Sequence, residues 1–200
     1  MGAADHAGWA VLITVAREAR LAPWLEARPP AGLPARLIDR RRVALLDGDL
    51  PKLPHHHEAQ GLAPREGVAL VERVRSSAER CARAALDTLA AAVPVKIAGI
   101  ALRRCPPLPA TVAERIASYR AQNVADSVMY REALAGAARA RGWFVAWYDA
   151  KQVLADAATA LGRATIEDDL KETGAALGPP WQKDHRTAMA AAIAALARKG

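Results

Sequence analysis

Cysteine and long apolar runs are scarce in this chain of 200 residues, and their scarcity excludes two classes of protein. Only Cys81 and Cys105 occur, which is too few for a disulfide-stabilised scaffold. The first apolar run, at 9–16, is too short to span a bilayer and lacks the positive flank of a secretory signal. We therefore expect one cytoplasmic domain over residues 1–200, because a hydrophobic fraction of 52% is enough to fill its core.

Several short catalytic motifs are absent as well. No glycine-rich phosphate-binding loop follows an expected strand, and neither a Gly-x-Ser-x-Gly elbow nor a paired-cysteine motif of the zinc or redox type occurs. The sequence therefore offers little support for a mononucleotide-binding protein or a serine hydrolase.

Positive charge is present in excess. The 28 lysines and arginines outnumber the 21 acidic residues, which gives a net charge of +7. Such a surplus favours anionic partners such as DNA or RNA, because basic side chains that bind phosphates release counterions. Arginine and alanine are both abundant, which a GC-rich genome also produces, so charge alone favours nucleic-acid binding and compositional bias about equally.

Apolar patterning predicts a mixed α/β domain. The β-branched run at 9–16 predicts a first strand buried in a sheet. Residues 47–63 contain two prolines and few large apolar groups, which predicts a flexible loop. Thr111 and Glu114 form a capping-box pattern at the start of a long helix. The other expected elements are short strands at 37–38 and 43–46, a helix at 64–93, a strand at 95–102, a helix at 111–141, a strand at 143–148, helices ending at Gly162 and before Gly178, and a last helix from Asp184.

Three segments carry a resemblance to a known family. They are VPVKIAGIALR at 93–103, WFVAWYD at 143–149 and KDHRTAMAAAIAAL at 183–196. In this order they resemble the last part of a Holliday-junction resolvase of the RuvC type, within the RNase H-like superfamily. The resemblance implies a three-layer RNase H-like domain, with a central mixed five-stranded sheet and helices on both faces, and a possible homodimer.

The resemblance also implies where catalytic acids belong. In that family, carboxylates on the first strand, at the end of the fourth strand and at the start of the last helix hold two divalent metal ions, Mg²⁺ or Mn²⁺. Here Thr14 stands on the expected first strand, and Arg103 and Arg104 follow the expected fourth strand. The last helix keeps Asp184 and His185 as catalytic candidates, with Asp184 as the candidate metal ligand.

We therefore expect a catalytically degenerate resolvase-like protein that binds a nucleic acid or a protein partner, with nucleic-acid contacts from Arg103, Arg104 and Arg120. One alternative is an oligomeric scaffold, favoured by alanine-rich helix faces and by the dimers of resolvases. Another is an active divalent-metal nuclease. Its acids would then come from unexpected places: Asp47, Asp49, Asp126, Asp149 and Asp184.

The expected long helix also carries a polar face. Asn123, Asp126 and Tyr130 follow Tyr119 at spacings of three and four, so all four share one side. Such a ridge lines a cleft in some proteins, but we favour a hydrogen-bonded seam or a solvent face.

Histidine and tryptophan provide two further candidate groups. The run at 55–58 (HHHE), with Asp47 and Asp49 upstream, has ligand types for a transition metal, although we favour a solvated loop because adjacent side chains rarely converge on one ion. Trp143 and Trp147 share one face of an expected strand. An exposed tryptophan can stack on an unpaired base, but core packing is the favoured role.

Overall fold

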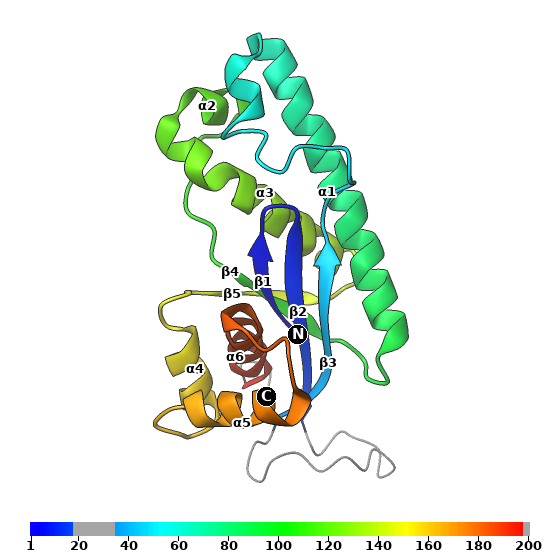
Figure 1. The fold of residues 1–200 in the computed structure, drawn as a ribbon, viewed down its shortest axis with the longest axis vertical. Coiled ribbons are helices and arrows are strands. Elements are labelled where there is room, and N and C mark those ends of the chain that lie inside the picture. The colour runs from blue at the N-terminus through cyan, green and yellow to red at the C-terminus, as the bar shows by residue number, and fades with distance from the viewer. Residues whose placement is uncertain (18–34, 198–200) are drawn as a thin grey trace.

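The computed structural model describes residues 1–17 and 35–197 of the chain. These residues form a five-stranded mixed sheet with helices packed on both faces (Figure 1). The predicted α/β class and mixed five-stranded sheet are confirmed, and the arrangement is consistent with a three-layer domain. Within the described residues, no helix combines the length and apolar character needed to cross a membrane.

The sheet has the strand order β3-β2-β1-β4-β5. The first three strands form an antiparallel meander, whereas β4 lies parallel to β1 and β5 lies parallel to β4. Helices connect β3 to β4 and β4 to β5. The strands are β1 (Gly2–His6), β2 (Trp9–Arg17), β3 (Ala35–Ala44), β4 (Gly99–Arg103) and β5 (Phe144–Tyr148).

The run at 9–16 belongs to the second strand, so its assignment as the first strand was wrong. Strand β1 precedes it and pairs with β2 over five residues through a tight turn at Gly8, whose φ of 82° favours glycine. The sequence GAADH of β1 has no β-branched residue, so local propensity gives no strand signal. Likewise, the two short strands expected at 37–38 and 43–46 form one continuous strand, β3, with an irregularity opposite Thr14 and Val15.

The helix expected at 111–141 is two helices. The capping box of Thr111 and Glu114 is confirmed, but the first helix ends after one and a half turns. Ser118 then has an extended backbone, and its hydroxyl accepts a hydrogen bond from the Ala121 N–H, which starts a second helix. The helices are α1 (Pro64–Ala92), α2 (Val112–Ala117), α3 (Tyr119–Arg139), α4 (Val153–Ala160), α5 (Glu167–Leu177) and α6 (Lys183–Ala197), with a 3₁₀ turn η2 (Glu58–Gly61).

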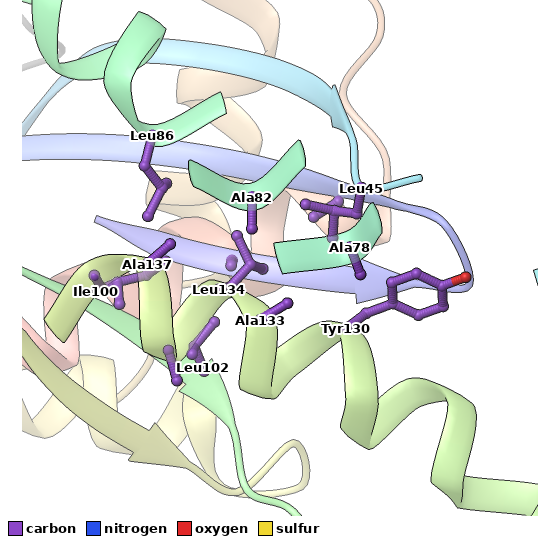
Figure 2. Packing of buried hydrophobic residues seen from close by; sticks show 14 of the residues in the cluster. Leu45, Ala78, Ala82, Leu86, Ile100, Leu102, Tyr130, Ala133, Leu134 and Ala137 are labelled. Carbon is purple, nitrogen blue, oxygen red and sulfur yellow. The ribbon is translucent and has the colours of Figure 1, made fainter. Parts of the chain in front are cut away.

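Apolar side chains fill the space on each side of the sheet. Helices α1 and α3 cover one face, where Leu86, Ile100 and Leu134 are fully buried (Figure 2). Ala78 and Ala82 of α1 face α3, and these small side chains let the two helices pack closely. Trp143 and Trp147 pack against this same core, which confirms their predicted structural role.

Helices α4, α5 and α6 contribute to the core on the other face, where alanines of α6 pack against β1 and β2. The approach of α6 is so close that a Cβ atom at Gly2 would overlap the carbonyl oxygen of Ala188. Glycine at this position therefore lets the backbone of α6, at Ala188 and Ala192, rest on the backbone at the start of β1.

Candidate functional site

One edge of the sheet gathers polar and charged side chains from four elements. Strands β1, β4 and β5 are parallel, so their carboxyl ends meet at the same edge, a common location for sites in α/β proteins. Asp5 and His6 end β1, while Arg103 and Tyr148 form the last register pair of β4 and β5. Asp184 joins this edge from the first turn of α6 through a hydrogen bond with His6.

Asp5 is held in a buried ion pair with Arg131 of α3. The guanidinium Nε donates to Asp5 Oδ2 at 2.8 Å, and the two side chains are only 2% and 7% exposed. A charge buried to this extent needs a partner of opposite sign, and the guanidinium supplies it from within the chain. The carboxylate of the first strand is therefore neutralised without any added ion.

Tyr148 lies among the charges of this edge. Its hydroxyl donates to the carbonyl oxygen of Ala3 at 2.8 Å, which ties β5 to β1 across β4. Burial raises the pKa of Tyr148 well above its ordinary value, and the nearby carboxylates of Asp5 and Asp184 raise it further, against the opposing effect of Arg103 and Arg131. The phenol therefore stays protonated and acts as a structural donor.

His6 occupies a fixed orientation on the α6 side of the same edge. Its Nε2 lies 3.0 Å from Asp184 Oδ2, and its ring stacks on Trp9 with centroids 4.1 Å apart and planes within 8°. The guanidinium carbon of Arg42 lies 3.9 Å from the centre of the Trp9 ring. Asp184, His6, Trp9 and Arg42 therefore form a row of side chains. It extends from the start of α6 across β1 and β2 to β3, the outermost strand on that side of the sheet.

The structure separates the two residues predicted at the start of the last helix. Asp184 faces His6, as described, but His185 is buried and its Nδ1 accepts a hydrogen bond from the Gln182 N–H at 3.2 Å. Burial lowers the pKa of His185, and the positive charge of Arg40 lowers it further. His185 therefore acts as a neutral acceptor that organises the start of α6.

The arginines predicted to contact nucleic acid are all exposed but do not form one group. Arg103 and Arg104 lie at the end of β4, next to the charged edge. Arg120 lies in the first turn of α3, beside α2 and away from the sheet (Figure 1). Two of the three predicted arginines therefore lie next to the charged edge of the sheet.

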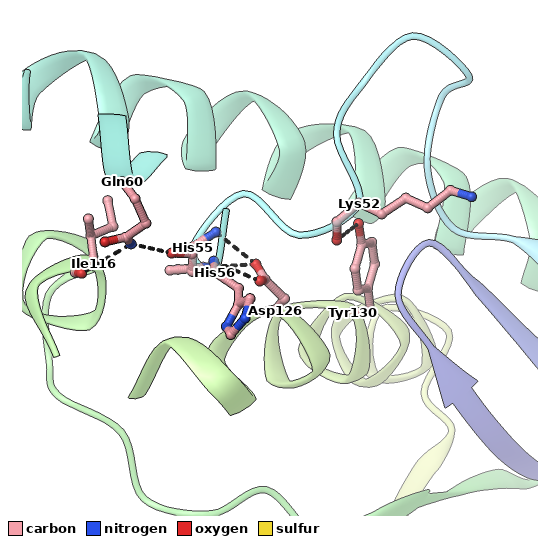
Figure 3. A network of polar contacts seen from close by, with 7 residues as sticks. All are labelled: Lys52, His55, His56, Gln60, Ile116, Asp126 and Tyr130. Carbon is pink, nitrogen blue, oxygen red and sulfur yellow. Dashed lines mark hydrogen bonds and ion pairs between the residues drawn. The ribbon is translucent and has the colours of Figure 1, made fainter. Parts of the chain in front are cut away.

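The polar face of α3 binds the segment at 47–63. Asp126 is buried and accepts hydrogen bonds from the backbone N–H groups of His55 and His56 at 3.0 and 3.2 Å and from His55 Nδ1 at 2.8 Å (Figure 3). The Tyr130 hydroxyl donates to the Lys52 carbonyl oxygen at 3.0 Å. Asp126 and Tyr130 thus lie in a hydrogen-bonded seam, one of the two favoured alternatives, whereas Asn123 is exposed and donates to the Tyr119 carbonyl oxygen.

The histidine run at 55–58 has a structural position. His55 is buried beneath Asp126, with 1% of its surface exposed, so the expectation of a fully solvated loop was wrong for this residue. Gln60 and Gln122 continue the network by donating to the carbonyl oxygens of His55 and Ile116. The segment thus joins α1, α2 and α3 at the end of the molecule beyond the sheet (Figure 1).

The side chains at the sheet edge do not fit the two divalent metal ions that the resolvase resemblance implies. A two-metal site needs several carboxylates with open coordination positions. Asp5 is already bound by Arg131, Arg103 stands at the end of β4, and His185 faces Gln182. Across residues 1–17 and 35–197, no three histidine, cysteine or acidic side chains are grouped so that they could hold a metal ion.

Two dispersed acids of the nuclease alternative, Asp47 and Asp149, also have other partners. Asp47 accepts hydrogen bonds from Ser77, Arg80 and Cys81 of α1, which lower its pKa. Asp149 accepts the Lys151 N–H at 2.7 Å and shapes the turn before α4. Neither side chain joins Asp5 or Asp184.

Sequence reasoning missed Asp5, His6 and Arg131. The signal that could have found the first two is the pattern Asp-His-Ala-Gly immediately before a strong strand, because glycine in a short turn indicates a hairpin whose first strand ends at the acid. No comparable signal marks Arg131, whose partner lies 126 residues away.

No family model, curated protein or solved structure matches this chain.

Proposed function

We propose that this chain is an RNase H-like domain, similar to resolvases of the RuvC type, in which binding of nucleic acid has replaced metal-dependent cleavage. The observation that carries the proposal is the buried pair of Asp5 and Arg131 at the carboxyl end of β1. An acid stands on the first strand, where the resemblance requires one, and an arginine of the same chain takes the place of the cation beside it.

The sheet topology supports the RNase H-like part of the proposal. The resemblance implies three meandering strands followed by two further strands that alternate with helices. The observed order and strand directions agree with that succession. The start of α6 also brings Asp184 to the end of β1, as the last helix of such a fold requires.

The charges at the sheet edge support the binding part. Arg103 and Arg104 replace the acid that a nuclease carries at the end of the fourth strand, and both side chains are exposed. Positive side chains on a surface that once held metal ions and phosphates keep the attraction for a phosphate backbone without activating water.

A binding experiment tests the proposal. Fluorescently labelled single-stranded, duplex and branched DNA, together with RNA, are titrated with the protein at low and moderate salt. We expect binding that weakens steeply with salt, and the double variant Arg103→Ala/Arg104→Ala reduces the slope of log affinity against log salt by about 1–2 units. The matched control, Arg73→Ala/Arg83→Ala on the exposed face of α1, keeps the slope of the wild type.

Two outcomes would contradict the proposal. If binding is absent or does not depend on salt, the protein does not bind nucleic acid through phosphate contacts. Cutting of any of these substrates with Mg²⁺ or Mn²⁺, lost on Asp5→Asn or Asp184→Ala, would instead establish the active nuclease.

A further inference from the structure

His6, Trp9 and Arg42 lie in a row, here called the ladder, in which the His6 ring stacks on the Trp9 ring and the guanidinium carbon of Arg42 lies over the Trp9 ring. The imidazole of His6 and the guanidinium of Arg42 each lie about 4 Å from the centre of the Trp9 ring, at 4.1 and 3.9 Å. Two planar groups at van der Waals distance from one ring cannot share one of its faces without overlapping. The indole is therefore enclosed between an imidazole on one face and a guanidinium on the other.

The ladder is fixed at one end and open at the other. Asp184 holds His6 through its Nε2, and Trp9 is half-buried against the core beneath α6. Arg42 is exposed on the edge strand β3, and within the described residues its side chain forms no hydrogen bond or ion pair. By contrast, its neighbours Arg40 and Arg41 are engaged with Gly178 and Asp39.

The unpaired cation at the end of the ladder has two properties that matter for a ligand. The Arg42 side chain is exposed, so a planar ligand can reach the guanidinium, and its N–H groups carry a positive charge. Trp9 holds that plane in place before any ligand arrives, which reduces the entropy lost on binding.

We propose that this ladder binds an unpaired nucleotide, whose base stacks on the open face of Arg42 while the guanidinium attracts the adjacent phosphate. Stacking on arginine and aromatic planes is how proteins bind bases that are not covered by neighbours in a duplex. The inference rests on the proposed function, because it names the part of the nucleic acid that the same region of the sheet recognises.

The test uses a substitution that keeps the charge and removes the plane. Arg42→Lys retains a cation on an exposed strand position, so the fold is expected to be intact. Its affinity is compared with that of the wild type for a single-stranded oligonucleotide, for the same strand with abasic sites in place of bases, and for a duplex. Arg73→Lys on α1 is the matched control.

We expect the wild type to bind the strand with bases about 5-fold or more tightly than the abasic strand, since stacking of one base contributes at least this much. Arg42→Lys abolishes that preference but leaves duplex binding unchanged, and Arg73→Lys changes neither.

Equal affinity for the normal and abasic strands, or an unchanged preference in Arg42→Lys, overturns the nucleotide site and leaves the proposed function standing. If none of the three probes binds, both proposals fail together.

Discussion

At the scale of single residues, the pair of Asp5 and Arg131 makes the strongest prediction about stability. Arg131→Met removes the guanidinium but leaves the carboxylate of Asp5 buried without a counter-charge. We expect the free energy of unfolding to fall by about 3–5 kcal/mol, the usual cost of breaking one half of a buried pair. Urea-induced unfolding measures this loss.

The double variant Asp5→Asn/Arg131→Met serves as the control, because it removes both charges. It should be clearly more stable than Arg131→Met alone, so that in a double-mutant cycle its loss of stability is smaller than the sum of the two single losses. Effects of the two substitutions that simply add would show that the ion pair is not the source.

His185 predicts how stability changes with pH. Its pKa is lowered in the folded protein, so the folded state favours the neutral ring, whereas the unfolded chain takes up a proton near the ordinary pKa of about 6.5. The contribution of this residue is therefore complete above about pH 6.5 and is lost as the pH falls below that value. Protonation of Nδ1 also removes the acceptor for the Gln182 N–H.

We expect His185→Asn, whose side-chain oxygen can accept the same hydrogen bond, to show a smaller decline in melting temperature between pH 7.5 and 5 than the wild type. The exposed residue His57 gives the matched control, His57→Asn, which should follow the wild-type profile. If the melting temperature of His185→Asn fell with pH in parallel with that of the wild type, His185 would not be the cause of the pH dependence.

At the scale of elements, the segment at 47–63 depends on one side chain of α3. Asp126 accepts hydrogen bonds from two backbone N–H groups and one imidazole N–H. Asp126→Ala leaves the two buried donors of His55 without an acceptor, whereas the His56 N–H keeps the Leu53 carbonyl oxygen. We expect a loss of at least about 1–3 kcal/mol, concentrated in this segment. Hydrogen exchange of the amides at 47–63 would quicken, while that of β1 and β2 would change little.

Asn123→Ala is the control on the same helix. Its side chain is exposed and bonds only to the backbone one turn earlier, so the change should stay within about 0.5 kcal/mol. Equal exchange rates in both variants would mean that other contacts hold the segment.

The elements that sequence predicted well are those whose signals are local. The apolar periodicity of α1 and the capping box of α2 each need only a few neighbouring residues, and both are present in the structure. Strand β1 has no such signal, because its alanines and glycine become a strand only through pairing with β2 and the close approach of α6 at Gly2. The break at Ser118 was missed because no proline or glycine interrupts residues 111–135.

The candidate site was predicted only in part, because most of its contacts join residues far apart in the sequence. Asp184 follows from its place at the start of a helix, but its partner His6 lies 178 residues away in sequence. Arg131 gives no sequence signal of its role, since a basic residue in a helix usually faces solvent. Long-range pairs of this kind depend on the complete topology, which no local pattern contains.

At the scale of the whole molecule, polar side chains have different roles in two regions. The end formed by α1, α2 and α3 uses its buried polar groups to fasten the segment at 47–63 (Figure 3). The edge of the sheet instead keeps Arg42, Arg103 and Arg104 exposed. Substitutions in the first region are therefore expected to change stability, and those of the three exposed arginines to change binding.

The covalent attachment of Arg131 to the same chain has a consequence for how the protein responds to its surroundings. A domain that borrows divalent ions gains stability in proportion to the logarithm of their free concentration, whereas a built-in guanidinium is always present at one equivalent. We expect the melting temperature to be the same in excess EDTA and in excess Mg²⁺ or Mn²⁺ at matched ionic strength. A rise with Mn²⁺ that Asp5→Asn abolishes would contradict this. The stability of the protein should therefore not depend on the supply of divalent metal ions.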